Sequence, residues 1–236
     1  MAKVVIFTGA GISAESGIDT FRDSGGVWEN FNIEDVCVKG CLEKNRDATI
    51  NFYDTRRIAL KDKQPNYAHK QIVNIQKKYP EKIKLITQNV DDLFEKAGAD
   101  DVIHVHGFLT QIRCTNCEYT EEIGYIPQSE AWDCCPMCQS MLRPDIVFFN
   151  ESAPFYEDMF RQMDDCEMLV VIGTSGATLC VGLMVDRGVK YTILNNLEEH
   201  YSIDHSKFDK TIFKPATKAV DEIVEDIEKF LAKESR

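Results

Sequence analysis

The sequence lacks three features that would assign it to a membrane, a secretory route or a nucleic acid. No apolar run approaches the roughly 20 residues that a membrane-spanning helix needs. The opening residues carry one lysine and an apolar run, Val4–Phe7, that is too short for the core of a signal peptide. Basic residues number 27 against 39 acidic ones, and the net charge of −12 argues against binding to a phosphate backbone. We therefore expect a cytoplasmic protein without a nucleic-acid or membrane partner.

The nine cysteines also lack the even number expected of a secreted disulfide framework. Four of them form two Cys-x-x-Cys pairs separated by residues 118–134, with Cys134 as a spare neighbour of the second pair. This spacing is typical of a tetrahedral zinc site with four thiolate ligands, which leaves no open position for chemistry. We therefore expect one structural zinc ion per chain, held by Cys114, Cys117, Cys135 and Cys138.

Short apolar runs alternate with amphipathic stretches along most of the chain. The runs suit strands that are buried on both faces of a parallel sheet, and they are Val4–Phe7, Ile83–Thr87, Val102–Val105, Met168–Ile172 and Tyr191–Leu194. The stretches between them have helical spacing, and they are His69–Lys78, Phe155–Met163 and Val220–Lys233. The alternation predicts an open α/β fold with a parallel sheet.

Two segments interrupt this alternation. Residues 32–68 are mostly helical in pattern and polar, and residues 109–145 carry the cysteines with little regular pattern. We expect the two segments to pack together as a helical and zinc-binding small domain. The sheet domain would then comprise residues 1–31, 69–108 and 146–236.

A glycine-containing loop directly follows the first predicted strand. Gly9-Ala10-Gly11 would allow a tight turn that brings backbone N–H groups close to a pyrophosphate at a helix N-terminus. Alone, the pattern is weak, because a glycine-bearing turn from strand to helix is common. The loop continues to Phe21 and Arg22, an aromatic ring that could cover a flat cofactor and a cation that suits a diphosphate.

Polar residues follow three other predicted strands, at the edge where an α/β sheet presents its functional groups. His104 and His106 share one face of a strand end; we expect His104 to be a hydrogen-bonded core residue and His106 to be the general base. Thr87–Asp91 offers amide, hydroxyl and carboxylate groups that suit ribose hydroxyls, or that could simply cap the next helix. Gly173-Thr174-Ser175 forms a further loop on this edge.

Taken together, these motifs resemble the sirtuin family, the NAD-dependent protein lysine deacylases. The resemblance runs in order from residue 4 to about residue 216. It rests on the segments 9–18, Phe21-Arg22, 87–91, His106-Gly107, the four cysteines, 142–147, 173–175 and 196–198.

The resemblance implies a Rossmann-like domain beside the small domain, with NAD in the cleft between them. It implies His106 as general base on the ribose hydroxyls and Asn89 as a second catalytic residue. The cofactor contacts that it implies are Gly9, Ala10, Gly11, Ser13, Glu15, Phe21, Arg22, Gln88, Asp91, Gly173, Thr174, Ser175, Asn196 and Ala216. The products would be nicotinamide, free lysine and 2′-O-acyl-ADP-ribose.

Tyr53 and Arg56 lie three residues apart in the helical insertion, so they share a helix face. The pair resembles the Tyr-x-x-Arg of sirtuins that remove succinyl and malonyl groups, where arginine binds a distal carboxylate. The plainer alternative is a buried tyrosine and a surface arginine. We expect a desuccinylase and demalonylase that also accepts acetyl-lysine.

The peptide groove implied by the resemblance involves Val147, Phe149 and Asn150, where the substrate backbone would add as a strand. Asn150 replaces the family's glycine, and asparagine tolerates a left-handed backbone better than most residues. Thr178 and Cys180 also depart from the family's usual valine and proline.

Two other functions stay open: ADP-ribosyl transfer or NAD hydrolysis in the same pocket, and a non-enzymatic NAD-sensing module. An intact His106 argues against the sensor, which needs no base. We expect a monomer whose partners are acyl-lysine side chains of proteins.

Overall fold

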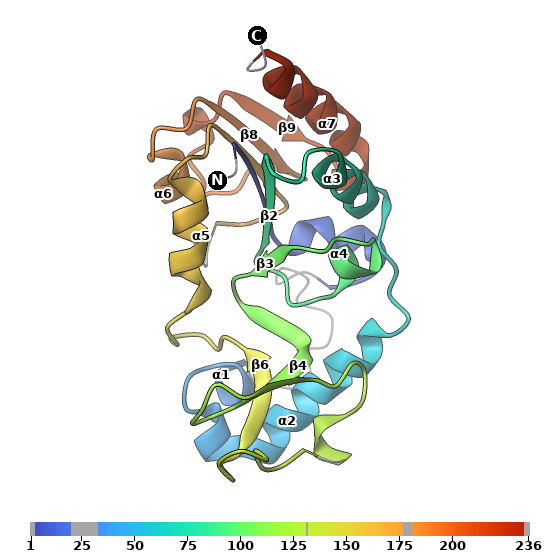
Figure 1. The fold of residues 1–236 in the computed structure, drawn as a ribbon, viewed down its shortest axis with the longest axis vertical. Helices are drawn as coiled ribbons and strands as arrows, with labels where there is room; N and C mark the ends of the chain where they lie inside the picture. The colour runs from blue at the N-terminus through green and yellow to red at the C-terminus, as the bar shows by residue number, and fades with distance from the viewer. Residues whose placement is uncertain (1–2, 20–32, 131, 177–180, 234–236) are drawn as a thin grey trace.

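The computed structural model describes residues 3–19, 33–130, 132–176 and 181–233 and shows an elongated molecule with two regions (Figure 1). The first contains a six-stranded sheet and the second a three-stranded sheet. We name them the large region (residues 3–19, 67–106, 155–176 and 181–233) and the small region (residues 33–60, 107–130 and 132–146). They lie at opposite ends of the long axis in Figure 1.

All strands of the large sheet are parallel, in the order β3-β2-β1-β7-β8-β9. Their bounds are β1 (Val4–Thr8), β2 (Ile83–Thr87), β3 (Val102–His104), β7 (Met168–Ile172), β8 (Tyr191–Asn196) and β9 (Lys210–Phe213). The predicted parallel α/β sheet is therefore confirmed, including each of the five predicted strands. The sequence pattern missed β9 because this edge strand buries only Ile212 and so lacks an apolar run.

Helices cover both faces of the large sheet (Figure 1). On one face α3 (Tyr67–Lys78) and α7 (Ala216–Lys233) pack against alternate strand residues such as Ile6. On the other face α5 (Phe155–Met163) packs against the intervening residues, such as Phe7. Burial on both faces is the reason that the strands are continuously apolar. Among the described helices, each is too short or too polar to cross a lipid bilayer.

The strand order creates a switch point between β1 and β7. From β1 the chain adds β2 and β3 on one side, and it later returns to add β7, β8 and β9 on the other. The connections after β1 and β7 therefore diverge, and open α/β sheets bind their ligands outside the carboxyl ends of the strands at such a point. Short helices α4 (Leu93–Lys96) and α6 (Gly182–Val185) follow β2 and β7.

The small region combines helices with an antiparallel sheet in the order β5-β4-β6. Its elements are α1 (Ile33–Val36), α2 (Cys41–Leu60), β4 (Gly107–Cys114), β5 (Thr120–Glu122) and β6 (Leu142–Ile146). The prediction that residues 32–68 are mostly helical is confirmed for the described residues 33–68. Residues 109–145, whose sequence shows little regular pattern, contain short strands, because strands with many polar or exposed residues leave no apolar run to detect.

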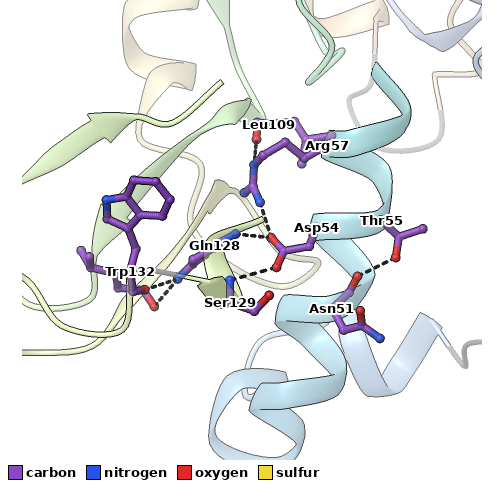
Figure 2. Close-up of polar contacts among 9 residues, drawn as sticks. Asn51, Asp54, Thr55, Arg57, Leu109, Gln128, Ser129 and Trp132 are labelled. Atoms are coloured by element: carbon purple, nitrogen blue, oxygen red, sulfur yellow. Dashed lines mark hydrogen bonds and ion pairs between the residues drawn. The ribbon is translucent and has the colours of Figure 1, made fainter. Parts of the chain in front are cut away.

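A buried ion pair attaches α2 to the rest of the small region (Figure 2). Arg57 is fully buried; it pairs with Asp54 and donates from Nε to the Leu109 carbonyl at 2.8 Å. The Asp54 carboxylate also accepts the backbone N–H groups of Gln128 and Ser129 at 2.7 and 3.0 Å. These bonds fix the rotation of α2 about its axis, and with it the direction of the neighbouring Tyr53–Arg56 face.

Candidate functional site

The loops after β1 and β7 pack directly against each other at the switch point. The Gly11 N–H donates to the Gly173 carbonyl at 2.8 Å. A Cβ on Gly9 would lie 2.8 Å from that same carbonyl oxygen, and a Cβ on Gly11 would lie 2.7 Å from the Gly173 Cα. Gly173 itself has a φ of 67°, in the region that favours glycine. The glycines are thus required by loop-to-loop contact, a reason that the sequence pattern did not indicate.

The sequence predicts the N-terminus of a helix directly after β1, and the structure differs from this prediction. Instead of an α-helix, residues 9–19 form two successive 3-10 turns, η1 (Ala10–Ile12) and η2 (Ala14–Ser16). Gly17 follows with a φ of 74°. The predicted contacts Phe21 and Arg22 lie outside the described residues, as do Thr178 and Cys180.

Four polar side chains form a hydrogen-bonded network centred on Ser13, in the loop after β1. The Ser13 hydroxyl donates to the Asp91 carboxylate at 2.9 Å and accepts from the Asn89 amide at 3.0 Å. His69 Nε2 lies 3.3 Å from the same hydroxyl oxygen. Burial lowers the pKa of His69 to about 4, so its ring is neutral and Nε2–H can donate to Ser13. Burial raises the pKa of Asp91, while the hydrogen bonds from Ser13 and the Leu93 N–H lower it.

Three of these residues were predicted, and the structure brings Ser13, Asn89 and Asp91 into one network. His69 was missed as a member. Its sequence context, near the start of an amphipathic helix, carries no chemical signal. In the structure it lies just after the helix cap Asn66, whose side chain accepts from the Ala68 and His69 N–H groups.

A second set of predicted residues joins the loops after β2, β7 and β8. Thr174 donates its hydroxyl to the Gln88 side chain at 2.7 Å, and Asn196 donates its amide to the Thr174 carbonyl at 2.9 Å. Ser175 lies half-buried beside them. Glu15 accepts from both the N–H and the hydroxyl of Thr217, so it binds the start of α7, where Ala216 also lies.

His104, the last residue of β3, and His106, two residues later, have different partners. His104 is held by the Asn89 carbonyl at 2.9 Å and by Glu95 at 3.0 Å, which fits the expected structural role. His106 Nδ1 lies 3.0 Å from the Gln88 carbonyl, and its Nε2 lies 2.9 Å from the hydroxyl of Tyr156. Burial lowers the pKa of His106, against a smaller upward effect of the Gln88 carbonyl. Tyr156 was not singled out from the sequence.

Tyr53 and Arg56 lie on the same side of α2, away from the Asp54–Arg57 pair. The Tyr53 ring is buried and stacks on Phe148 with centroids 5.6 Å apart. Its hydroxyl donates to the Cys37 thiol at 3.5 Å, and burial keeps its pKa well above the ordinary value. Arg56 is half-buried with its guanidinium 5.5 Å from the centroid of the Phe52 ring. Burial raises the pKa of Tyr53 and of Cys37, and the charge of Arg56 offsets a small part of each increase.

The segment after β6 joins the two regions. The Val147 N–H donates to the His106 carbonyl at 2.9 Å, which places Phe148 and the Tyr53 ring next to the histidine strand end. Phe149 already uses both backbone groups: its N–H donates to Cys37 and its carbonyl accepts from Lys39. A substrate strand would therefore pair with other backbone groups here. Asn150 has a φ of 65°, the left-handed conformation that its identity was expected to tolerate.

The four predicted cysteine ligands meet at one point of the small region. Their sulfur atoms all lie within 4.8 Å of one another, with Cys114–Cys138 at 3.5 Å and Cys117–Cys135 at 3.6 Å. Tetrahedral zinc with bonds of about 2.3 Å sets its sulfurs about 3.8 Å apart, so the cluster fits one zinc ion with no open position.

Comparison with known proteins agrees with this geometry. A model of the Sir2 family matches residues 9–179. A protein of Campylobacter jejuni (strain RM1221), named NAD-dependent protein deacylase, is 40% identical over 232 residues, covering 98% of each chain. A protein of Helicobacter hepaticus with the same name is 40% identical over 257 residues, covering 98% of this chain and 99% of the relative.

Solved structures show the same fold. The structure of a Sir2 homologue–NAD complex superposes with a TM-score of 0.84 at 33% identity, covering 97% of this chain and 90% of the other. A further Sir2 enzyme structure has a TM-score of 0.76 at 29% identity, covering 96% and 93%. The chain belongs to the Sir2 family.

Proposed function

We propose that this chain is an NAD-dependent protein deacylase that transfers the acyl group of a modified lysine to ADP-ribose. One observation carries the proposal: His106 and the Ser13–Asn89–Asp91 network converge on the carboxyl edge of the sheet at its switch point. Open α/β sheets bind nucleotides at this place. Relatives that carry the name NAD-dependent protein deacylase match nearly the whole chain, which supports the same activity here.

The buried polar groups suit the cofactor. NAD, when bound, supplies a ribose whose bond to nicotinamide is easily broken. The Ser13–Asn89–Asp91 network holds the loops after β1 and β2 in a fixed arrangement, so they need little reorganisation when the ribose binds. His106 has its neutral form favoured by burial, and its Nε2 can take a proton from a ribose hydroxyl. The products would be nicotinamide, free lysine and 2′-O-acyl-ADP-ribose.

The His106→Ala variant tests this activity. A general base contributes about 10²–10⁴-fold, so we expect kcat for deacylation to fall at least about 100-fold. NAD affinity, measured by calorimetry, should change by no more than about threefold. His205→Ala, in the 3-10 turn His205–Lys207 away from this network, is the matched control and should keep full activity. Undiminished deacylation by His106→Ala would overturn the assignment of the base.

We further propose that the acyl groups include succinyl and malonyl, recognised by Tyr53 and Arg56. The Tyr53 hydroxyl is buried and protonated, and the hydrogen-bond acceptor found for it is a thiol, which is a weak acceptor. A carboxylate at this place would replace it with a charge-assisted hydrogen bond. Arg56 supplies a cation on the same face of α2, three residues after Tyr53.

Product analysis separates this proposal from its alternatives. Peptides carrying acetyl-, succinyl- or malonyl-lysine would be incubated with NAD, and the products identified by mass spectrometry. We expect all three to be deacylated, with Tyr53→Phe raising KM for the two acidic acyl groups by about tenfold. Nicotinamide release without deacylation would instead indicate ADP-ribosyl transfer or NAD hydrolysis. NAD binding without any turnover would indicate a sensor.

A further inference from the structure

Tyr156 lies in the first turn of α5, on the face of the large sheet opposite α3 and α7 (Figure 1). Met159 and Met163, farther along the helix, are buried in the cluster that also contains Val105, the residue before His106. The ring of Tyr156 packs against this cluster. The apolar contacts of α5 therefore hold the tyrosine next to the histidine, with ring centroids 6.0 Å apart.

The hydrogen bonds of His106 define which nitrogen carries the proton. A carbonyl oxygen can only accept, so the contact between Nδ1 and the Gln88 carbonyl requires a proton on Nδ1. In the neutral ring Nε2 then has a lone pair, and the Tyr156 hydroxyl, 2.9 Å away, donates to it. Burial raises the pKa of Tyr156, so the hydroxyl keeps its proton at neutral pH. The lone pair that a general base needs is therefore occupied by Tyr156.

We propose that Tyr156 is a positioning residue for His106: its hydroxyl holds Nε2 while the site is empty and gives up this place to the ribose hydroxyl. This inference rests on the proposed function, in which Nε2 takes the ribose proton. The Tyr156 hydroxyl and the ribose hydroxyl can each donate to the lone pair of Nε2. One can therefore replace the other without leaving the buried His106 ring unpaired. The bond keeps His106 in the tautomer and orientation that proton transfer requires.

The bond also favours the neutral imidazole, because only the neutral ring has a lone pair at Nε2. No charged side chain of the described residues contributes to the pKa shift of His106, which comes from burial and, in the opposite sense, the Gln88 carbonyl. His104, two residues earlier, faces Glu95 and the Asn89 carbonyl instead. Loss of the Tyr156 hydroxyl should therefore raise the pKa of His106 without competing charge effects.

Tyr156→Phe tests the inference, because it removes one oxygen and keeps the ring. The Cε1–H signals of the histidines would be titrated by NMR in ligand-free protein, with His106→Ala used to assign the signal. We expect the pKa of His106 to rise by about half a unit to one unit, which corresponds to one lost hydrogen bond. Tyr201→Phe, which alters a side chain that is 95% exposed, is the control and should leave the His106 titration unchanged.

Addition of ADP-ribose, which carries the ribose hydroxyls, tests the exchange. At saturation the His106 pKa should become the same in the wild type and Tyr156→Phe, because Tyr156 no longer contacts Nε2. With NAD and acyl peptide, the acid limb of kcat/KM should shift in the variant and that of kcat should not. An unchanged pKa in the ligand-free variant, or a difference that persists with ADP-ribose, would overturn the inference. These NMR results do not depend on turnover, so absent deacylation would contradict the proposed function alone.

Discussion

The two regions of the molecule are stabilised by different means. The large region is a parallel sheet with apolar clusters on both faces, and its central strands β1 and β7 are continuously buried. The small region has smaller apolar clusters, and it adds a four-cysteine site and the buried Asp54–Arg57 pair. A short chain segment cannot bury enough apolar surface to fold on hydrophobic contacts alone, so metal and polar contacts supply the remainder. This difference predicts which substitutions should destabilise each region.

Loss of zinc should have the largest effect, and it should be confined to the small region. Cys135→Ser removes a buried ligand, and zinc binding in small structural sites contributes about 10 kcal/mol or more. We expect metal analysis to show no bound zinc and hydrogen exchange to show lost protection in β4 and β6, with β1 and β7 still protected. Cys134→Ser is the matched control, since this exposed neighbour is outside the cluster. Equal loss of protection in both regions would contradict the comparison.

The adjacent arginines of α2 sharpen the same comparison. Arg57→Met leaves the buried Asp54 carboxylate without its cation, which should cost about 3–5 kcal/mol of unfolding free energy. Arg56→Met changes a half-buried side chain and should cost less than about 1 kcal/mol. Urea denaturation measures both values. A similar cost for the two variants would show that the division between a structural and a functional arginine is wrong.

The stability of the large region should depend on pH through His69. Its pKa is lowered from 6.5 to about 4, so the unfolded chain binds a proton in a range where the folded chain does not. Its contribution to stability is therefore present above pH 6.5 and is lost as the pH falls towards 4, by up to about 3 kcal/mol. His69→Gln should weaken this acid dependence when unfolding free energies are compared between pH 4 and 7. The same slope in the variant would show that another group is responsible.

Asn150 should give the smallest effect, at the junction of the regions. With a φ of 65°, Asn150→Ala should lose about 1 kcal/mol, whereas Asn150→Gly should be neutral or slightly stabilising. Thermal unfolding of the two variants measures the difference. Equal melting temperatures would show that the left-handed backbone is not what asparagine accommodates here.

The same difference explains what could be predicted from the sequence. Strands such as β7 were predicted because burial on both faces leaves an apolar run, and the cysteine ligands because zinc requires a regular spacing. The edge strand β9 and the polar strand β5 have too few buried residues to produce a pattern.

Contacts between residues that lie far apart in the chain could not be predicted from the sequence. His69, in α3, contacts Ser13, and Tyr156, in α5, contacts His106 across 50 positions of the sequence. Position 11 requires glycine because it contacts Gly173, and this contact also depends on the packing of two distant loops. Such groups carry no local motif, so only the fold reveals them.

The central claim is that the large region supplies the catalytic base and the small region selects the acyl group. The most direct test is the ratio of kcat/KM for succinyl-lysine to that for acetyl-lysine peptides, in the wild type and in Arg56→Met. Loss of a charge-assisted contact should lower this ratio about 10- to 100-fold, with acetyl-lysine turnover unchanged within about threefold. An unchanged ratio, or an equal loss of both activities, would contradict the account.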